Sequence, residues 1–221
     1  MDDKRYLLSL IREGEHQQQD FKYRVSDACK LARSVSAFAN TDGGRLLIGV
    51  RDDGRLCGVR SEEEIYVMHQ AAYKYCRPQP SISFDTYHIE GRTFVVCTIP
   101  PSQKRPICAI DTPDPTKAFG QMKPPLERRR AYIRIKDENI MASPVHLAMW
   151  REALKPHGTM MTYDDDVQRL LGSMEGRKPL WQVVRLSRLP RPKVIVLLAR
   201  LVHFGVVRCE YCDQQFLFSL S

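Results

Sequence analysis

One segment restricts the possible folds of this chain more than any other. From Ala28 to Asn40, small and apolar residues recur with the spacing of a helix. Residues 41–44 read Thr-Asp-Gly-Gly, which is typical of a tight turn because glycine adopts positive φ at low cost. Arg45 to Val50 then forms an apolar run of strand length. The segment therefore predicts a fold that mixes helix and sheet.

Turn residues elsewhere predict two β-hairpins. Asp53-Gly54 separates the 45–50 strand from an expected partner at 55–59, and Gly91 separates strands expected at 81–90 and 93–99. Further elements are expected as helices at 3–13, 62–76 and 143–154, and as strands at 18–23 and 131–136. Residues 100–125 are rich in Pro, Lys and Arg and lack periodicity, so we expect a long loop there.

The last third of the chain has a different pattern. Lys155-Pro156-His157-Gly158 is the expected linker. The elements predicted after it are three helices and a hairpin, at 163–173, 179–186, 191–203, 206–211 and 215–220. This order is typical of a winged helix-turn-helix, a variant of the DNA-binding motif. We therefore expect an α+β protein with two domains, at 1–154 and 159–221.

Charge and composition narrow the classes of protein. The formal net charge is +8, and residues 151–221 hold 11 basic but only 7 acidic residues, which favours polyanionic partners such as nucleic acid. The longest apolar runs are too short to span a bilayer, and the first residues lack the features of a signal peptide. The seven cysteines are odd in number and dispersed, as in reduced thiols. We expect a cytoplasmic protein without membrane spans.

Several stretches together resemble one family. They are Glu15–Lys22 (EHQQQDFK), Ser36–Val50 (SAFANTDGGRLLIGV), Pro101–Pro106, Ala131–Arg134, and Asn139 with Ala142–Pro144. Over roughly residues 5–150 the sequence resembles the Schlafen-type Alba-like domain. The resemblance implies a mixed-sheet α/β module that associates with nucleic acid, in bacterial members often followed by a winged helix. It favours a DNA-binding transcriptional regulator. A Walker A pattern for ATP is absent from the sequence.

The resemblance also implies an alternative function. Schlafen relatives that cleave RNA hold a divalent metal with three acidic residues, and the matching positions here are Glu15, Asp20 and Asp52, with Asp53 as an alternative to Asp52. Carboxylate oxygens suit Mg²⁺ or Mn²⁺, which would stabilise charge on the attacked phosphate. The alternative is thus a metal-dependent endoribonuclease. The residues also allow a structural interpretation, because Asp-Asp-Gly is an ordinary hairpin turn.

Basic residues are the expected contacts to nucleic acid. Arg128, Arg129 and Arg130 precede the strand expected at 131–136, where alternate side chains point in opposite directions, so the three cannot all face one ligand. The full set of expected contacts is Lys22, Arg105, Arg128, Arg130, Arg134, Arg188, Arg191 and Lys193.

Two features of the tail leave alternatives open. The expected recognition helix at 191–203 is apolar beyond one stripe, at Ile195, Val196 and Val202, so contact with a second copy in a homodimer competes with reading of DNA. Cys209 and Cys212 have the spacing of one half of a zinc site, but a second pair of ligands is not evident in the sequence. We interpret them as two thiols at the turn of a wing.

Overall fold

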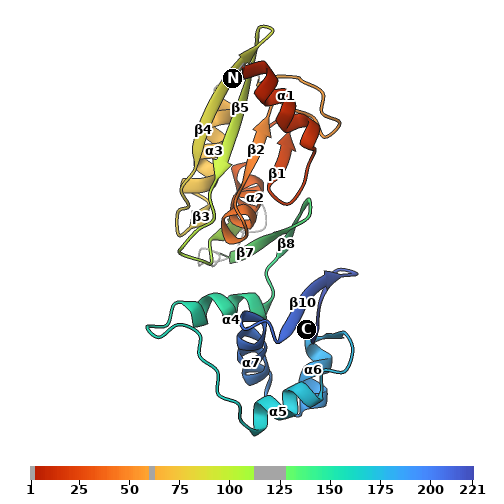
Figure 1. Ribbon diagram of the computed structural model, residues 1–221. Coiled ribbons are helices and arrows are strands. Elements are labelled where there is room, and N and C mark those ends of the chain that lie inside the picture. The colour runs from red at the N-terminus through yellow and green to blue at the C-terminus, as the bar shows by residue number, and fades with distance from the viewer. Residues whose placement is uncertain (1–2, 60–62, 112–127) are drawn as a thin grey trace, which may run out of the picture. The chain divides into compact units, whose positions relative to one another are not determined.

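The computed structural model describes residues 3–59, 63–111 and 128–221, and the chain divides into two compact units, Met1–Met141 and Ala142–Ser221 (Figure 1). Both units combine helices with β-structure, so the expected α+β class is confirmed. Among the described residues, no helix has the length and apolar character needed to cross a membrane.

In its described residues, the first unit holds two four-stranded sheets and three helices. Its elements are α1 (Asp3–Glu13), β1 (Gln19–Lys22), α2 (Ala28–Asn40), β2 (Gly44–Ile48), α3 (Glu63–Tyr73), β3 (Cys76–Arg77), β4 (Ser83–Ile89), β5 (Arg92–Ile99), β6 (Cys108–Asp111), β7 (Arg128–Ile135) and β8 (Glu138–Met141). The first sheet has the order β1-β2-β5-β4, and the second β3-β6-β7-β8. Because β1 and β2 run parallel while their neighbours are antiparallel, the first sheet is mixed.

The hairpin expected between 45–50 and 55–59 is wrong. Strand β2 pairs with β1 on one side and with β5 on the other, and the expected partner segment contributes a single isolated bridge between Val50 and Leu56. The reason is that β2 is an inner strand of the sheet, so β1 and β5 occupy both of its edges and leave none for residues 55–59. The hairpin of β4 and β5 is confirmed.

Alternation along β2 divides the apolar residues of the first unit between two cores. Leu46 and Ile48 pack with α2 and α3 on one face, whereas Leu47 packs with Leu7 and Leu10 of α1 on the other. Helix α2 is the centre of the larger core, because ten of its thirteen residues are buried. The helical period seen in the sequence at 28–40 therefore marks a helix that is buried over most of its surface, with Lys30 and Arg33 exposed.

Part of the expected long loop is a strand. Residues 108–111 form β6, which pairs with β3 and β7 and packs against α2. This strand was not expected because it is only four residues long and depends on pairing with its neighbours. Residues 112–125 of the expected loop lie outside the described residues.

The second unit contains four helices and a small sheet. Its elements are α4 (Pro144–Ala153), α5 (Asp165–Gly172), β9 (Lys178–Pro179), α6 (Leu180–Ser187), α7 (Arg191–His203), β10 (Val207–Cys212) and β11 (Gln215–Leu220). The sheet has the order β10-β11-β9, with antiparallel pairing throughout. One core unites residues of α4, α5, α6 and α7 with Val207 and Phe218 of the hairpin.

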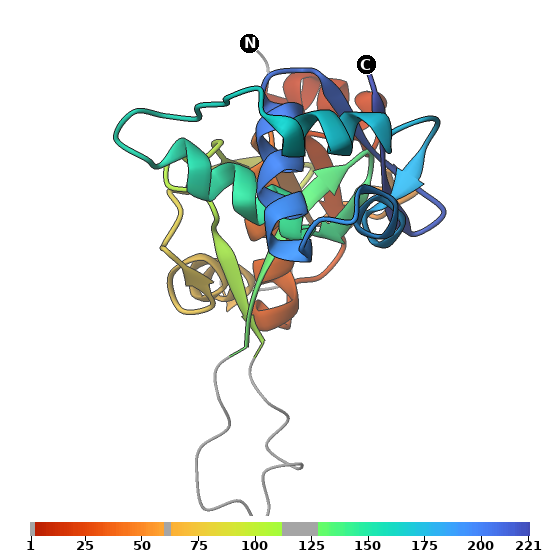
Figure 2. The same cartoon turned by 90° about the horizontal axis from the view of Figure 1, so that it is seen from below.

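The boundary between the units differs from the expected linker at 155–158. Helix α4 packs against α7 and shares its core, as Figures 1 and 2 show, so the structure groups α4 with the second unit. Val145 and Ala148 of α4 are buried there. The Pro-Gly composition of 155–158 marked a loop correctly, but this loop lies within a unit.

Candidate nucleic-acid interface

Ser36 and Asn40, which belong to the stretch on which the family resemblance rests, join α2 to other elements of the fold. Asn40 is 3% exposed; its side chain accepts a hydrogen bond from the Ile107 amide (2.8 Å) and donates to the carbonyls of Ile107 (2.8 Å) and Tyr132 (2.9 Å). The Ser36 hydroxyl accepts from the Tyr132 amide at 3.0 Å. These bonds satisfy buried backbone groups, and they fix α2 against the second sheet.

Arg134 is buried, which contradicts its expected role as a contact to nucleic acid. Its side chain is 1% exposed, and Nη2 lies 3.2 Å from Oδ1 of Asp20. Nη1 donates to Asn139 Oδ1 at 3.0 Å, and the guanidinium lies over the Phe38 ring, 4.9 Å from its centroid. A phosphate cannot reach this group while the fold is intact, so Arg134 serves to hold β7 beside β1.

Two more of the expected contacts are engaged with the protein itself. The Lys22 ammonium lies 2.6 Å from Oδ2 of Asp20 and donates to the Phe21 carbonyl at 2.8 Å. Arg105 is half-buried, and its Nη2 donates to the Thr41 carbonyl at 2.7 Å. Arg105 therefore ties the segment after β5 to the end of α2.

The three carboxylates of the ribonuclease alternative are in different environments. Glu15 and Asp20 lie together, and Glu15 Oε1 accepts from the Phe21 amide at 2.8 Å. Burial, followed by the neighbouring Asp20, raises the pKa of Glu15 above its usual value. Asp52 is exposed in the turn after β2.

A metal site for that alternative is not formed. Among residues 3–59, 63–111 and 128–221, no three or more His, Cys, Asp or Glu side chains are grouped so as to hold a metal ion. Asp20 is instead neutralised by Arg134 and Lys22. The residues present do not fit Mg²⁺ or Mn²⁺, and we derive no metal-dependent step.

Exposed cations of the first unit include two groups considered as contacts to nucleic acid. Arg128 and Arg130 are exposed at the start of β7, and so is Arg129 between them, so alternation does not decide their exposure. A hollow of about 230 Å³ lies between the end of β1 and the start of α2, and its basic lining residues are Lys22, Arg24 and Lys30. Sequence reasoning missed Arg24 and Lys30, because nothing local shows that they border the same hollow as Lys22.

In the second unit, two cations of α7 are already paired. Lys193 forms an ion pair with Asp166 of α5, and Arg200 Nε donates to Glu152 Oε2 of α4 at 2.8 Å. Arg191 is exposed in the first turn of α7. Arg188 is exposed between α6 and α7, where it adopts the left-handed conformation with φ 56°. Of the expected contacts of this unit, Lys193 is therefore held in an ion pair, whereas Arg188 and Arg191 are exposed.

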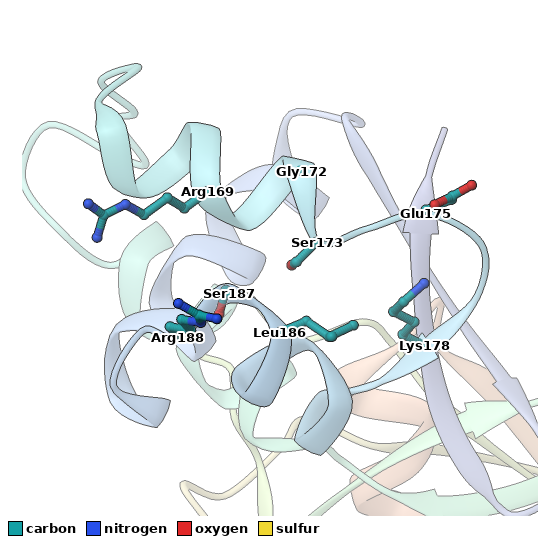
Figure 3. Close-up of a pocket in the computed structure, with 8 residues that line it drawn as sticks. All are labelled: Arg169, Gly172, Ser173, Glu175, Lys178, Leu186, Ser187 and Arg188. Atoms are coloured by element: carbon teal, nitrogen blue, oxygen red, sulfur yellow. The ribbon is translucent and has the colours of Figure 1, made fainter.

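A larger pocket runs along α6 (Figure 3). Its volume is about 690 Å³, and it is lined by Arg169, Gly172, Ser173, Glu175, Lys178, Leu186, Ser187 and Arg188. Figure 3 shows Arg169 and Arg188 at one end and Glu175 at the other. Sequence reasoning found Arg188 but missed Arg169 and Lys178, because only the packing of α5 beside α6 brings them together.

Cys209 and Cys212 belong to β10, and their odd separation along the strand directs their side chains to opposite faces. Cys209 packs against the core, where burial raises its pKa to about 12. This placement supports the interpretation as two thiols and opposes a shared zinc ion. No disulfide joins any of the seven cysteines.

Two solved structures are similar to this chain. The DIP2311 protein of Corynebacterium diphtheriae is 18% identical, with a TM-score of 0.48, and the match covers 91% of this chain but 34% of that one. The chain thus spans about a third of the length of that protein. The N-terminal domain of an ATP-dependent DNA helicase RecG-related protein from Nitrosomonas europaea is 25% identical, with a TM-score of 0.40, over 52% of this chain and 84% of that one.

Among curated proteins, none matches the chain significantly. The family model described as Schlafen, AlbA_2 matches residues 15–143, more than half of the chain. The matched region contains β1 with Asp20, the α2–β2 segment with Asn40, and strand β7 with Arg134. These are the elements that the buried network joins, and the chain belongs to the Schlafen, AlbA_2 family.

Proposed function

We propose that this protein binds nucleic acid and acts as a DNA-binding transcriptional regulator, with a Schlafen AlbA_2 domain followed by a winged helix. The observation that carries the proposal is the architecture of the second unit. Its elements from α5 onward follow the order helix, strand, helix, helix and hairpin, and the first strand pairs with the last. A helix-turn-helix variant with a β-wing has this arrangement.

The junction between α6 and α7 supports the same proposal. Three residues, Arg188, Leu189 and Pro190, separate the two helices, and Leu189 is buried in the core. A short turn of this kind holds two helices at a large angle, as the helix-turn-helix requires. In this proposal α7 is the recognition helix, its first turn carries the exposed Arg191, and α4 is an additional helix that precedes the winged helix.

In the first unit, the proposal assigns phosphate contact to the exposed cations. Arg128 and Arg130 share one face of β7, and Lys22, Arg24 and Lys30 border the hollow beside α2. Such contacts would supply affinity without reading sequence. The buried Arg134 and the half-buried Arg105 have no place in this set.

Contact with a second copy through α7 is less supported than the sequence indicates. Ala199 is fully buried, and Ile195 and Val202 pack against the core that α4 completes, so much of the apolar surface outside the main stripe is covered within the chain. Sedimentation equilibrium tests the point, and we expect a monomer. A stable dimer that Val196→Asp dissociates would restore the homodimer alternative.

Fluorescence anisotropy of the full chain with labelled duplex DNA and with single-stranded RNA tests the proposed function. We expect DNA binding whose affinity falls steeply between about 50 and 200 mM salt, since cation–phosphate contacts release counterions. A flat salt response, or no binding to either nucleic acid, would overturn the proposal.

A selection from a random duplex library tests the regulatory part. We expect enrichment of one sequence motif, and Arg191→Gln should weaken binding to that motif more than binding to random DNA. The matched control is Arg151→Gln, which removes one positive charge from an exposed position of α4. Enrichment of RNA with no preferred DNA would contradict the assignment as a transcriptional regulator.

A further inference from the structure

The cations of the second unit fall into two groups by their partners. Lys155, Arg177, Lys193 and Arg200 each form an ion pair with a carboxylate. Within the described part of the chain, Arg169, Lys178 and Arg188 have no carboxylate within ion-pair distance, and all three line the pocket along α6. Within the same residues, Arg151, Arg185, Arg191 and Arg208 also lack such a partner, but they do not line the pocket. The pocket thus gathers three of seven unpaired cations in one concave place, where field lines are focused.

The two arginines of the pocket lie apart from its acidic residue, whereas Lys178 lies on the same side as Glu175 (Figure 3). Arg169 extends from the last turn of α5, and Arg188 follows the end of α6, so two guanidinium groups come from different helices to the same end. Glu175 lies at the far end, away from both arginines (Figure 3). The hydroxyl of Ser173 donates to the Leu170 carbonyl at 2.6 Å. The charged side chains are therefore the groups left to bind a ligand.

The chemistry of these groups selects the ligand. A guanidinium presents paired N–H donors that match two oxygens of a phosphate, and an ammonium serves as a point charge for the same anion. A pocket of about 690 Å³ has room for more than a single phosphate. Its open, elongated lining from α5 to β9 suits a chain of phosphates better than an enclosed small molecule.

We propose that this pocket binds the phosphate backbone of nucleic acid, with Arg169 and Arg188 on one phosphate and Lys178 on a neighbouring one. The inference rests on the proposed function and adds a second surface of the unit that contacts nucleic acid. Contact with the backbone falls on the α5–α6 side, because Lys193 and Arg200 of α7 are committed to Asp166 and Glu152. The pocket would orient the unit on the duplex, while the first turn of α7 reads it.

The first test compares two double variants of the full chain by anisotropy with duplex DNA across a salt series. Arg169→Gln with Arg188→Gln removes two pocket charges, and Arg151→Gln with Arg208→Gln removes two exposed charges of the same unit elsewhere. For the pocket variant we expect weaker binding and a slope of log K against log salt reduced by about 2. The control variant should keep the slope of the unaltered protein, and equal slopes in both variants would overturn the inference.

The second test does not need nucleic acid. In ¹⁵N-labelled protein, pyrophosphate should shift the Nε–Hε signals of Arg169 and Arg188 and leave those of Arg151 and Arg208 unchanged. If the chain binds DNA but pyrophosphate moves neither pocket signal, the pocket assignment fails while the proposed function stands. If pyrophosphate binds but no nucleic acid does, the occupant is a small phosphorylated molecule, and the backbone assignment fails together with the proposed function.

Discussion

The Nη2 atom of Arg134 lies 3.2 Å from Oδ1 of Asp20, and this contact joins β7 to β1. The two side chains are only 1% and 7% exposed. Loss of Asp20 leaves the buried Arg134 without its carboxylate, and loss of Arg134 leaves the buried Asp20 with Lys22 alone, so either change costs far more than the pair contributes as a whole. Arg134, the basic residue of the Ala-Tyr-Ile-Arg stretch, therefore stabilises the fold.

Replacement of this arginine should destabilise the first unit strongly. We expect Arg134→Met to lower the free energy of unfolding by about 3–5 kcal/mol, because Asp20 remains buried with one cation fewer. Urea denaturation followed by far-UV circular dichroism measures the change. The control is Lys4→Met, since the Lys4–Glu90 pair is 48% and 70% exposed and its loss should change the free energy of unfolding little. Similar losses in the two variants would contradict a structural role for Arg134.

Truncation of Asn40 should open the junction between α2 and the second sheet. In Asn40→Ala the Ile107 amide loses its acceptor and the Tyr132 carbonyl loses a donor, at a total cost of at least about 2 kcal/mol. Hydrogen exchange at the Ile107 amide should accelerate markedly. Gln79→Ala removes an exposed bond to the Tyr73 carbonyl and should leave that exchange rate unchanged. Unaltered protection of Ile107 in Asn40→Ala would refute the assigned role.

Two glycine substitutions should have opposite effects. A Cβ at Gly44 would collide with the Phe38 ring and approach the Gln18 carbonyl to 2.8 Å, so Gly44→Ala should lower the melting temperature. At Gly172, in the last turn of α5, a Cβ would meet nothing within 4 Å. Gly172→Ala should therefore be neutral or add up to about 1 kcal/mol. Differential scanning calorimetry distinguishes them, and a stable Gly44→Ala protein would show that α2 and β2 tolerate a wider separation.

Acid should destabilise the second unit through His146. Burial lowers the pKa of His146 to about 4, so below the usual histidine pKa of about 6.5 the unfolded chain binds a proton that the folded unit excludes. Stability should fall by roughly 3 kcal/mol in total as the pH drops from about 6.5 to 4. Both tryptophans, Trp150 and Trp181, lie in this unit, so their fluorescence reports its unfolding.

The histidine variant supplies the comparison. His146→Phe keeps a ring beside Phe216, whose centroid lies 4.9 Å from that of His146, and it should remove most of the loss between pH 6.5 and 4. The matched change at the exposed His157, His157→Gln, should retain the loss. If His146→Phe shows the pH profile of the unaltered chain, another group is responsible.

Local patterns predicted the helices well, because the period of a helix is contained within its own residues. The expected helix at 191–203 matches α7 in both bounds, and the tight turn at 41–44 matches the end of α2. The pairing of β2 with β5 was beyond such patterns, since the turn residues Asp53-Gly54 say nothing about a partner at 92–99.

The arginines of β7 show that local patterns also failed to predict which residues of the candidate site are exposed. Arg128, Arg130 and Arg134 have the same parity along the strand, yet the first two are exposed and the third is buried. Alternation assigns a side chain to a face of the sheet, but what covers that face depends on α2 and β1, which come from distant parts of the sequence. The pocket along α6 was missed for a related reason, because its cations come from α5, β9 and the end of α6.

The packing of α4 on α7 has a practical consequence for any shortened form of this protein. A fragment that begins at residue 159 would lack Val145 and Ala148 and would expose to water the apolar surface of α7 that α4 covers. Exposed apolar surfaces of that kind cause molecules to associate with one another. Self-association of such a fragment would then result from the absence of α4, and it would not be evidence for the natural assembly of the protein.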